Sequence, residues 1–309
     1  MKEIYFNHDG NIDDLVSYLI LLQAPDIDLL GVGAIDADGY IDPSVEACRK
    51  MTDRFNLRHD KLEVARSNSR AINQFPHEWR LATYSFNYLP LLNESGHIDT
   101  KEAALPAHQD MIAKLKAAKT PVTLVMTGPL TDLARALDED PTIEAKIDRL
   151  YWMGASLDGH GNVDMVNADG TQEWNAFWDP ESVARVFASK LKIQMVGLES
   201  TEELPLSPEL RQHWAALRQY PAIDLVGQGY ALIVAVPTAQ LYLWDVLTTV
   251  SALYPEVVET RTAKASVVTT GLAAGKVYED EAGRPITLVT KANKALFYEK
   301  IDHILKRTD

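Results

Sequence analysis

Oxygen-bearing side chains are concentrated in one short segment near the start of the chain. Residues 7–14 read Asn-His-Asp-Gly-Asn-Ile-Asp-Asp, and this segment holds the carboxylates Asp9, Asp13 and Asp14. One carboxylate is enough to cap a helix, whereas several packed together repel one another unless a cation lies between them. Carboxylate and amide oxygens are the preferred ligands of hard cations such as Ca²⁺ and Mg²⁺. The segment therefore predicts a metal site, and capping of the next helix by Asp9 or Asn11 is the plainer alternative.

The pattern of the remaining chain shows which elements would position this segment. Apolar runs with the length of buried strands lie at residues 3–7, 28–35, 121–126, 149–153 and 192–198. Stretches with helical apolar spacing lie at residues 12–23, 43–55, 180–189, 245–253 and 294–305. This alternation is typical of a mostly parallel, Rossmann-like sheet with helices on both faces. Because no linker or repeat interrupts it, we expect a single α/β domain over residues 1–309.

In such sheets, ligands bind at the carboxyl ends of the strands, so these ends indicate which further residues could belong to the site. The segments at the predicted strand ends are 7–14, 36–38, 127–129, 153–162 and 198–201. Taken alone, Asp245 is typical of a helix N-cap, and the Thr127-Gly128 turn is typical of a plain connection between a strand and a helix. The polar groups among the aromatic residues of 161–175 could equally belong to a loop that packs on the core.

The composition excludes several classes of partner. The chain has 30 Lys and Arg against 44 Asp and Glu, a formal net charge of −14, which argues against binding nucleic acid through its phosphates. A single cysteine, Cys48, excludes an intrachain disulfide and a thiolate metal cluster. The longest apolar run, 230–236, is too short to span a membrane, and the first residues lack the pattern of a secretory signal. We therefore expect a cytoplasmic protein without membrane or nucleic-acid partners.

Short motifs in one consistent order resemble those of the nucleoside hydrolase family. Residues 7–14 resemble the family's DxDxGxDD signature, and Gly10-Asn11 is similar to the purine-specific (inosine–adenosine–guanosine preferring) branch, where other branches have Pro-Gly. The further motifs are DAD at 36–38, FPHEW at 75–79, TGPL at 127–130, WMG at 152–154, GN at 161–162, DGTQEWN at 169–175, WDP at 178–180 and WD at 244–245. Together they extend over residues 3–250.

The resemblance implies hydrolysis of the N-glycosidic bond of ribonucleosides, with purines preferred, by a homodimer that binds one Ca²⁺ per site. It implies that Asp9 is the general base, and that Asp9, Asp14, Asp245 and the Thr127 main-chain carbonyl hold the ion. Asp38, near N7 of the purine, and Trp244 are the other implied catalytic residues. The implied substrate-binding residues are Asp13, Glu78, Asn162, Glu173 and Asn175 at the ribose, Met153 against the sugar, Trp79 with Trp244 on the base, and Trp174.

The chain departs from the family pattern in three respects. Asn7 replaces the first Asp of the signature, and we expect altered support for the metal site rather than its loss. Residues 235–241 lack the Arg and Tyr that the purine-specific branch carries before its Trp-Asp pair. No His precedes Asp245, so the leaving-group acid of the inosine–uridine branch is also absent. The base preference is therefore open.

Three alternatives remain beside a purine-preferring hydrolase. One is a broad or pyrimidine-preferring nucleoside hydrolase, and another is a non-catalytic protein that binds calcium and nucleosides. A phosphatase of the Asp-x-Asp type is more distant. None of these hypotheses assigns a role to a histidine. We expect His77, His97 and His160 at the surface or in loops, and the His8 side chain on the face opposite Asp9.

Overall fold

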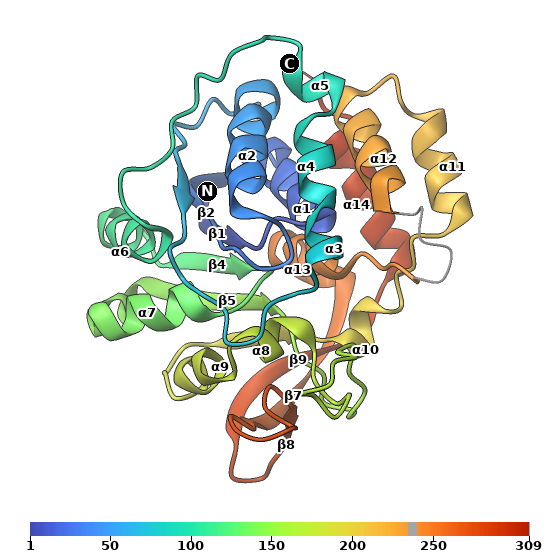
Figure 1. Cartoon of the computed structure of the whole chain (residues 1–309). Coiled ribbons are helices and arrows are strands. Elements are labelled where there is room, and N and C mark those ends of the chain that lie inside the picture. The colour runs from blue at the N-terminus through green and yellow to red at the C-terminus, as the bar shows by residue number, and fades with distance from the viewer. Residues whose placement is uncertain (234–239, 309) are drawn as a thin grey trace.

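The computed structural model describes residues 1–233 and 240–308, and one β-sheet forms its centre (Figure 1). The sheet has nine strands in the order β3-β2-β1-β4-β5-β6-β9-β7-β8. The strands are β1 (Lys2–His8), β2 (Ile27–Ala34), β3 (Val64–Arg66), β4 (Val122–Met126), β5 (Ile147–Met153), β6 (Ile193–Val196), β7 (Val258–Val267), β8 (Val277–Glu279) and β9 (Arg284–Ala292).

The sheet is mostly parallel, as the sequence predicts. Neighbouring strands run parallel from β3 through β9, and β7 at one edge is antiparallel to both of its neighbours, β9 and β8. In the register of the central strands, Asn7 of β1 pairs with Gly33 of β2 and Met126 of β4. The residues that follow these three strands therefore emerge side by side at one edge of the sheet.

Helices follow most of the strands and cover both faces of the sheet (Figure 1). They are α1 (Ile12–Gln23), α2 (Ile41–Phe55), α3 (His77–Arg80), α4 (Ala82–Asn87), α5 (Pro90–Asn93), α6 (Ala107–Ala117), α7 (Thr131–Glu139), α8 (Trp174–Trp178), α9 (Pro180–Phe187), α10 (Leu198–Thr201), α11 (Pro208–Ala216), α12 (Pro221–Ile233), α13 (Trp244–Leu253) and α14 (Lys294–Leu305). Within the described ranges, none of these helices has both the length and the apolar content needed to cross a membrane.

Two apolar clusters join these layers. One cluster lies between the sheet and helices α1, α2, α12, α13 and α14, and it includes Phe6, Leu15 and Leu247. The other lies on the opposite face under α6, α7 and α9, and it includes Tyr5 and Trp152. Since the side chains of successive β1 residues pack into opposite clusters, the strand is buried on both faces, as central parallel strands are.

The antiparallel edge and the short strand β3 at the other edge are the parts of the sheet that the sequence does not predict. Strand β7 is exposed along much of its length, and within it only Ala263 and Ala265 are buried. Its residues are therefore largely polar, and they form no apolar run that would mark a strand. The predicted strand at 192–198 is also too long, because β6 ends at Val196 and Leu198 already begins the short helix α10.

The turn between β1 and α1 distinguishes between the two possible caps of α1. The Asn11 side-chain oxygen accepts the Ile12 N–H at 2.7 Å, and Asp14 Oδ2 accepts the Asn11 N–H at 2.9 Å. The Asn11 side chain also accepts from the Asp14 N–H, and this exchange with Asp14 is a capping box, so Asn11 is the N-cap and the carboxylate of Asp9 is not needed as the cap. Gly10 has a φ of +86°, and a Cβ at this position would lie 1.9 Å from Ser44 Oγ.

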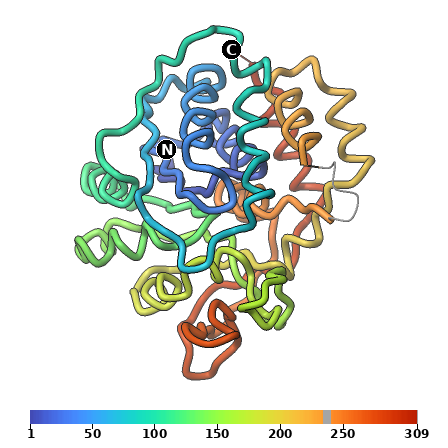
Figure 2. The backbone as a smooth tube through the Cα atoms, in the orientation of Figure 1, coloured from blue at the N-terminus to red at the C-terminus, as the bar shows by residue number. Residues whose placement is uncertain are grey.

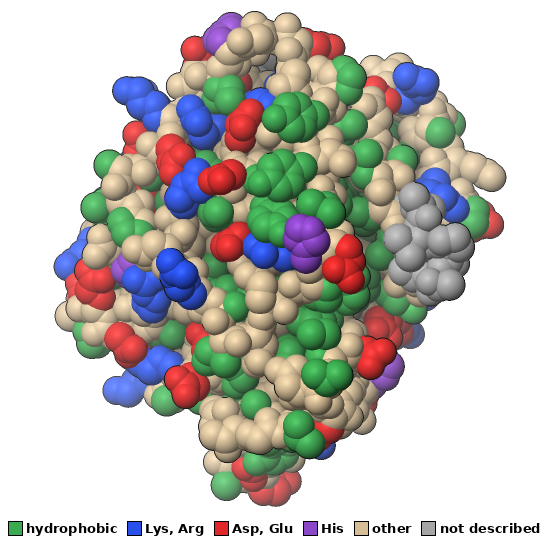
Figure 3. Space-filling model, in the orientation of Figure 1, with side chains coloured by type: hydrophobic (Ala, Val, Ile, Leu, Met, Phe, Trp, Pro, Cys, Tyr) green, Lys and Arg blue, Asp and Glu red, His purple; other side chains and the backbone are tan. Residues whose placement is uncertain are grey.

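A long connection links β3 to α6 and carries α3, α4 and α5. In Figure 2 it descends on the left, rises again as α3 and α4, and returns over the top to α6. Hydrophobic side chains gather over α3 and α4 on the face shown in Figure 3. The exposed large hydrophobic residues of these two helices and their junctions are Trp79, Leu81, Tyr84 and Tyr88.

Candidate active site

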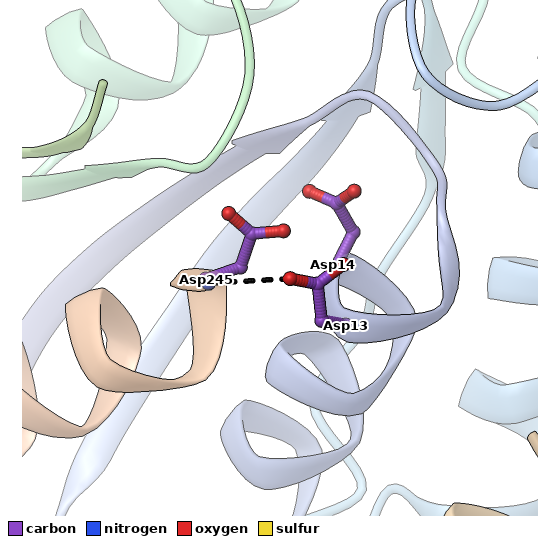
Figure 4. A group of neighbouring side chains, drawn as sticks. All are labelled: Asp13, Asp14 and Asp245. Atoms are coloured by element: carbon purple, nitrogen blue, oxygen red, sulfur yellow. Dashed lines mark hydrogen bonds between the residues drawn. The ribbon is translucent and has the colours of Figure 1, made fainter. Parts of the chain in front are cut away.

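Three buried carboxylates meet where α1 and α13 begin. One oxygen from each of Asp13, Asp14 and Asp245 lies within 4.8 Å of the others (Figure 4). The Asp245 N–H donates to Asp13 Oδ2 at 3.4 Å, which ties the start of α13 to the first turn of α1. The structure thus brings Asp245 to the N-terminal segment from more than two hundred residues away in the chain.

Asp9 and Thr127 lie beside this group. The Asp9 N–H donates to Asp14 Oδ1 at 3.4 Å, and the Thr127 hydroxyl donates to the same oxygen at 2.5 Å. A Cβ on Gly128 would lie 2.8 Å from the Cβ of Asp9, so the turn after β4 packs directly against Asp9. Residues from the ends of β1 and β4 and from the start of α13 therefore form one continuous acidic site.

The carboxylates of this site disfavour their own ionisation. Burial and the neighbouring Asp14 raise the pKa of Asp9 well above its ordinary value, and burial and Asp13 do the same to the pKa of Asp245. Burial and Asp14 raise the pKa of Asp13 to about 7, and burial raises the pKa of Asp14 to about 6. Buried carboxylates at this spacing need a cation to ionise together, and an oxygen-only donor set fits a hard divalent ion.

Asp38 joins the site from the turn after β2. Its N–H donates to Asp9 Oδ2 at 3.3 Å, and its Oδ2 accepts a hydrogen bond of 2.6 Å from Asn11 Nδ2. Its Oδ1 is buried and has no protein partner within the described residues. Burial raises the pKa of Asp38 to about 7. The Asp38 carboxyl thus has one oxygen that remains able to contact a ligand.

Asn175 connects the ends of β4 and β5. Its Nδ2 donates to the Thr127 carbonyl at 3.3 Å and to the Met153 carbonyl at 3.2 Å. Its Oδ1 is buried and unpaired within the described residues. Met153 is itself buried next to this amide, with its sulfur 3.4 Å from Nδ2. Asn175 therefore has an acceptor oxygen available for a hydroxyl donor.

Glu173 is largely engaged in holding the backbone. Its Oε1 accepts the Asn175 N–H at 2.9 Å, and its Oε2 accepts the N–H groups of Ala155 and Ala176 at 2.7 and 3.2 Å. The residue caps α8 and is buried, and burial raises its pKa to about 7. These contacts show how Glu173 shapes the loop after β5, in addition to the ribose contact that the resemblance implies.

The predicted aromatic residues differ in their exposure. Trp174 is buried, with its ring stacked 4.7 Å from Phe75 and edge-on to Trp79 at 5.5 Å. Trp79 is 47% exposed on α3, so its ring is supported by Trp174 on one side and open on the rest. Trp244, at the start of α13, is half-buried beside Tyr242, and its Nε1 is buried without a partner within the described residues. The structure therefore places Trp174 in the supporting core and leaves the other two indoles closer to solvent.

Two predicted substrate-binding residues lie at the surface. The Asn162 side chain is exposed, although its Oδ1 accepts the Trp174 N–H at 3.1 Å. Glu78 is exposed on α3, next to Trp79. Of the segment before the Trp-Asp pair, residues 235–239 lie outside the described residues.

The family is decided by comparison with known proteins. A sequence model of the family described as "Inosine-uridine preferring nucleoside hydrolase" matches residues 4–303. The chain belongs to this family. The nucleoside hydrolase resemblance of the motifs is thereby confirmed.

Curated relatives of the chain carry a broader name. The non-specific ribonucleoside hydrolase RihC of Escherichia fergusonii is 30% identical over 216 residues, and that of Escherichia coli K12 is 29% identical over 213. Each match covers 67% of this chain and 64% of the relative. The chain thus spans about 64% of the length of the curated relatives that it matches.

Solved structures confirm the α/β fold. A crystal structure of an inosine-uridine preferring nucleoside hydrolase from Bacillus anthracis is 45% identical, with a TM-score of 0.96 and complete coverage of both chains. A purine-preferring ribonucleoside hydrolase from Gardnerella vaginalis is 21% identical, with a TM-score of 0.77 and 99% coverage of both chains, which shows the fold alone. These likenesses do not assign the chain to the purine-specific branch.

Asn7 has a partner that sequence reasoning missed. Its Nδ2 donates to Asp132 Oδ2 at 3.1 Å, and Asp132 Oδ1 accepts the hydroxyls of Ser67 and Ser69 at 2.7 and 2.8 Å. Asp132 is fully buried near the start of α7. A carboxylate at position 7 would face this one, so the amide is the group that fits here. The Thr-Asp pair at the start of a predicted helix resembles any N-terminal turn, so the sequence contains no distinctive signal for this contact.

The histidines lie away from the acidic site. His8 is fully buried, with its Nε2 3.2 Å from Cys48 Sγ and its ring centroid 5.0 Å from that of Phe6 and 6.4 Å from that of Tyr18. The exposed histidines named in the sequence analysis are His77, His97 and His160.

Proposed function

We propose that this nucleoside hydrolase cleaves the N-glycosidic bond of ribonucleosides with the help of Ca²⁺, and that it prefers purines. The observation that carries the proposal is the group of buried carboxylates Asp13, Asp14 and Asp245 beside Asp9. Such a group is poorly compatible with a metal-free resting state at neutral pH, because its members repel one another. The proposal also agrees with the names of the relatives, which describe ribonucleoside hydrolases.

The donor set fits the proposed ion. Asp9, Asp14, Asp245 and the Thr127 carbonyl would hold Ca²⁺, and the adjacent Asp13 would face the ribose. When bound, Ca²⁺ supplies orientation of the ribose hydroxyls and a lowered pKa for one water. The Oδ1 atoms of Asp38 and Asn175, which have no partner among the described residues, are acceptors that a bound sugar or base could satisfy.

The chain's own residues divide the chemistry between them. A water oxygen bonds to C1′ of the ribose while the C1′–N bond breaks, and the electron pair of that bond leaves with the base. Asp9 accepts a proton from the water as general base. The carboxylates around the sugar stabilise the positive charge that develops on the ribosyl group. Asp38 lies beside Asp9, and its raised pKa lets it hold a proton near neutrality for the departing purine.

The base preference rests on the aromatic residues. Trp79 and Trp244 would stack on the base, which is worth about 1–3 kcal/mol for each stacked base by analogy with nucleic-acid binding. A broader or pyrimidine-preferring activity is the second candidate, because curated relatives are named non-specific and the Bacillus anthracis structure is named inosine-uridine preferring. Pairing of Asn7 with Asp132 gives the substitution in the signature a structural explanation, so the substitution is no argument for a non-catalytic binding protein.

A substrate panel tests the preference. Release of free base and ribose is measured for inosine, adenosine, guanosine, uridine and cytidine in the presence of Ca²⁺. Higher kcat/KM values for the purine nucleosides are expected. A kcat/KM for uridine that equals or exceeds that for inosine would contradict the purine preference and support the broader enzyme, while the mechanism would stand.

The proposed assembly is a cytoplasmic homodimer, which rests on the family resemblance. Analytical ultracentrifugation of the full chain is expected to give twice the mass of one chain. A monomer or a tetramer that retains activity would contradict the dimer and leave the site unaffected.

A further inference from the structure

Arg80 connects the short helix α3 to the turn that follows β2. Its Nε donates to the Ala37 carbonyl at 2.8 Å, and its Nη2 pairs with Asp36 Oδ1 at 2.5 Å. The guanidinium also lies over the ring of Tyr40, with its carbon 4.1 Å from the ring centroid. Only 9% of the Arg80 side chain is exposed, so these contacts lie largely away from solvent.

The residues next to this connection are two groups that the proposed function assigns to the base. Trp79 immediately precedes Arg80 on α3, and Asp38 immediately follows Ala37 in the turn. One side chain therefore joins the backbone segments that carry the stacking ring and the carboxyl near the purine. Within the described part of the chain, Arg80 is the α3 residue that forms an ion pair with this turn, and His77 of the same helix hydrogen-bonds the Tyr40 hydroxyl.

Helix α3 needs such a connection because it has little stability of its own. It has four residues and no side-chain cap at its start, and isolated helices of this length do not persist in water. Trp79 contacts Trp174 edge-on, with the two ring centroids 5.5 Å apart, and Trp174 belongs to α8 rather than to the turn after β2. Gln74 Nε2 donates to the Asp36 carbonyl at 2.8 Å, so the segment before α3 stays attached to the turn without Arg80.

We propose that Arg80 is a positioning residue for base recognition, because it fixes the spacing between Trp79 and Asp38. The inference rests on the proposed function, in which these two residues contact the purine. The planar guanidinium donates to the Ala37 carbonyl, pairs with the Asp36 carboxylate and covers the Tyr40 ring at the same time. A lysine ammonium is a single compact charge on a flexible stem, and it cannot reproduce that arrangement.

The test compares Arg80→Lys with a matched control, Arg58→Lys. The Arg58 side chain is 10% exposed, donates to the carbonyls of Leu21 and Leu22 at 2.9 and 3.2 Å, and pairs with Asp60. Arg58 is therefore about as buried as Arg80 and also donates hydrogen bonds to main-chain carbonyls. It lies at the C-terminal end of α1, whereas the acidic site lies at the N-terminal end. Both variants are expected to lower the melting temperature by a similar amount.

The first readout separates base recognition from sugar chemistry. For Arg80→Lys, kcat/KM for inosine is expected to fall about tenfold or more, since small misplacements near a reacting centre have effects of this size. For p-nitrophenyl riboside, whose leaving group needs no purine contact, the fall is expected to stay below about twofold. Arg58→Lys should leave the ratio of the two substrates unchanged. Equal losses for both substrates in Arg80→Lys would overturn the proposal.

The second readout does not depend on turnover. Calorimetry on the Ca²⁺-loaded protein measures the affinity for hypoxanthine and for ribose separately. Weaker hypoxanthine binding with unchanged ribose binding in Arg80→Lys supports the positioning role, and unchanged hypoxanthine binding overturns it. If the wild-type protein hydrolyses neither substrate, the proposed function fails, and hypoxanthine binding still decides the role of Arg80.

Discussion

At the scale of single residues, the acidic site depends on partners that lie far away in the chain. Asp245 and Asp13 meet although they begin different helices, and Asn7 of β1 meets Asp132 of α7. The signature around Asp9 marks where the site is, because its residue types are unusual for a simple turn. The partner of Asn7 could not be predicted, since hydrogen bonding between distant residues leaves no local pattern.

The pair of Asn7 and Asp132 gives a stability prediction. Asn7→Asp would place two buried carboxylate oxygens about as close as the present 3.1 Å contact, and we expect a loss of about 3 kcal/mol in the free energy of unfolding. Adding Asp132→Asn should restore most of the loss, because its Oδ1 still accepts from Ser67 and Ser69 while its Nδ2 donates to the new carboxylate. Urea denaturation of the metal-free proteins measures both effects, and a double variant no more stable than Asn7→Asp would refute the pairing.

Asp9 gives a prediction in which activity and stability move in opposite directions. Asp9→Asn should lower kcat by about 10²–10⁴-fold, the usual contribution of a general base. The same change should raise the melting temperature of the metal-free protein at pH 8, because it removes a carboxylate whose pKa burial and Asp14 raise. Steady-state kinetics and thermal melts test this, and a near wild-type rate would rule out Asp9 as the base.

At the scale of elements, the sequence predicts the parallel centre of the sheet and not its antiparallel edge. Strands β1, β2, β4 and β5 each contain a short apolar run, because most of their length is buried on both faces. Strand β7 is mostly exposed, and the pairing of β9 beside β6 follows from long-range packing. The site was predictable where residues follow the apolar strands. It was less so at α3, a four-residue helix without a periodic pattern.

The close packing of two turns gives a prediction about Gly128. A Cβ there would lie 2.8 Å from Asp9 Cβ, so Gly128→Ala must displace the turn after β4 or the Asp9 side chain. We expect weaker Ca²⁺ binding and a lower kcat. Gly227→Ala on α12 is the matched control, because among the described residues its added Cβ would meet Trp214 Cβ at 3.9 Å, an ordinary contact distance. Calcium titrations followed by calorimetry measure the difference, and equal affinities in the two variants would contradict the packing argument.

At the scale of the whole molecule, the acidic site makes stability depend on pH and on the metal. Burial raises the pKa of Asp13, Asp38 and Glu173 to about 7 and that of Asp14 to about 6, all above the values in an unfolded chain. At a pH between the ordinary pKa of these groups in an unfolded chain and their raised pKa in the folded protein, the folded, metal-free protein therefore binds more protons than the unfolded chain. Its stability contribution from these groups is complete at low pH and is lost as the pH rises through 6 to 7.

This linkage gives a prediction about melting curves. Without metal, the melting temperature should be lower at pH 8 than at pH 5, because the buried carboxyls bind protons more tightly in the folded protein than in the unfolded chain. Saturating Ca²⁺ should raise it most at pH 8, where the carboxylates are ionised and bind the ion best. Scanning calorimetry with chelator and with Ca²⁺ checks both trends. A metal-free melting temperature that rises across this range would show that these carboxyls do not have raised pKa values.

The most direct measurement of the central claim is inosine hydrolysis through one cycle of metal removal and return. Hypoxanthine and ribose are quantified for the enzyme as purified, after chelation, and after Ca²⁺ is added back, with Asp9→Asn measured in parallel. The account predicts equal amounts of both products, loss of turnover after chelation, recovery with Ca²⁺, and little turnover by the variant throughout. Undiminished turnover in the chelated enzyme, or no release of either product at any stage, would contradict it.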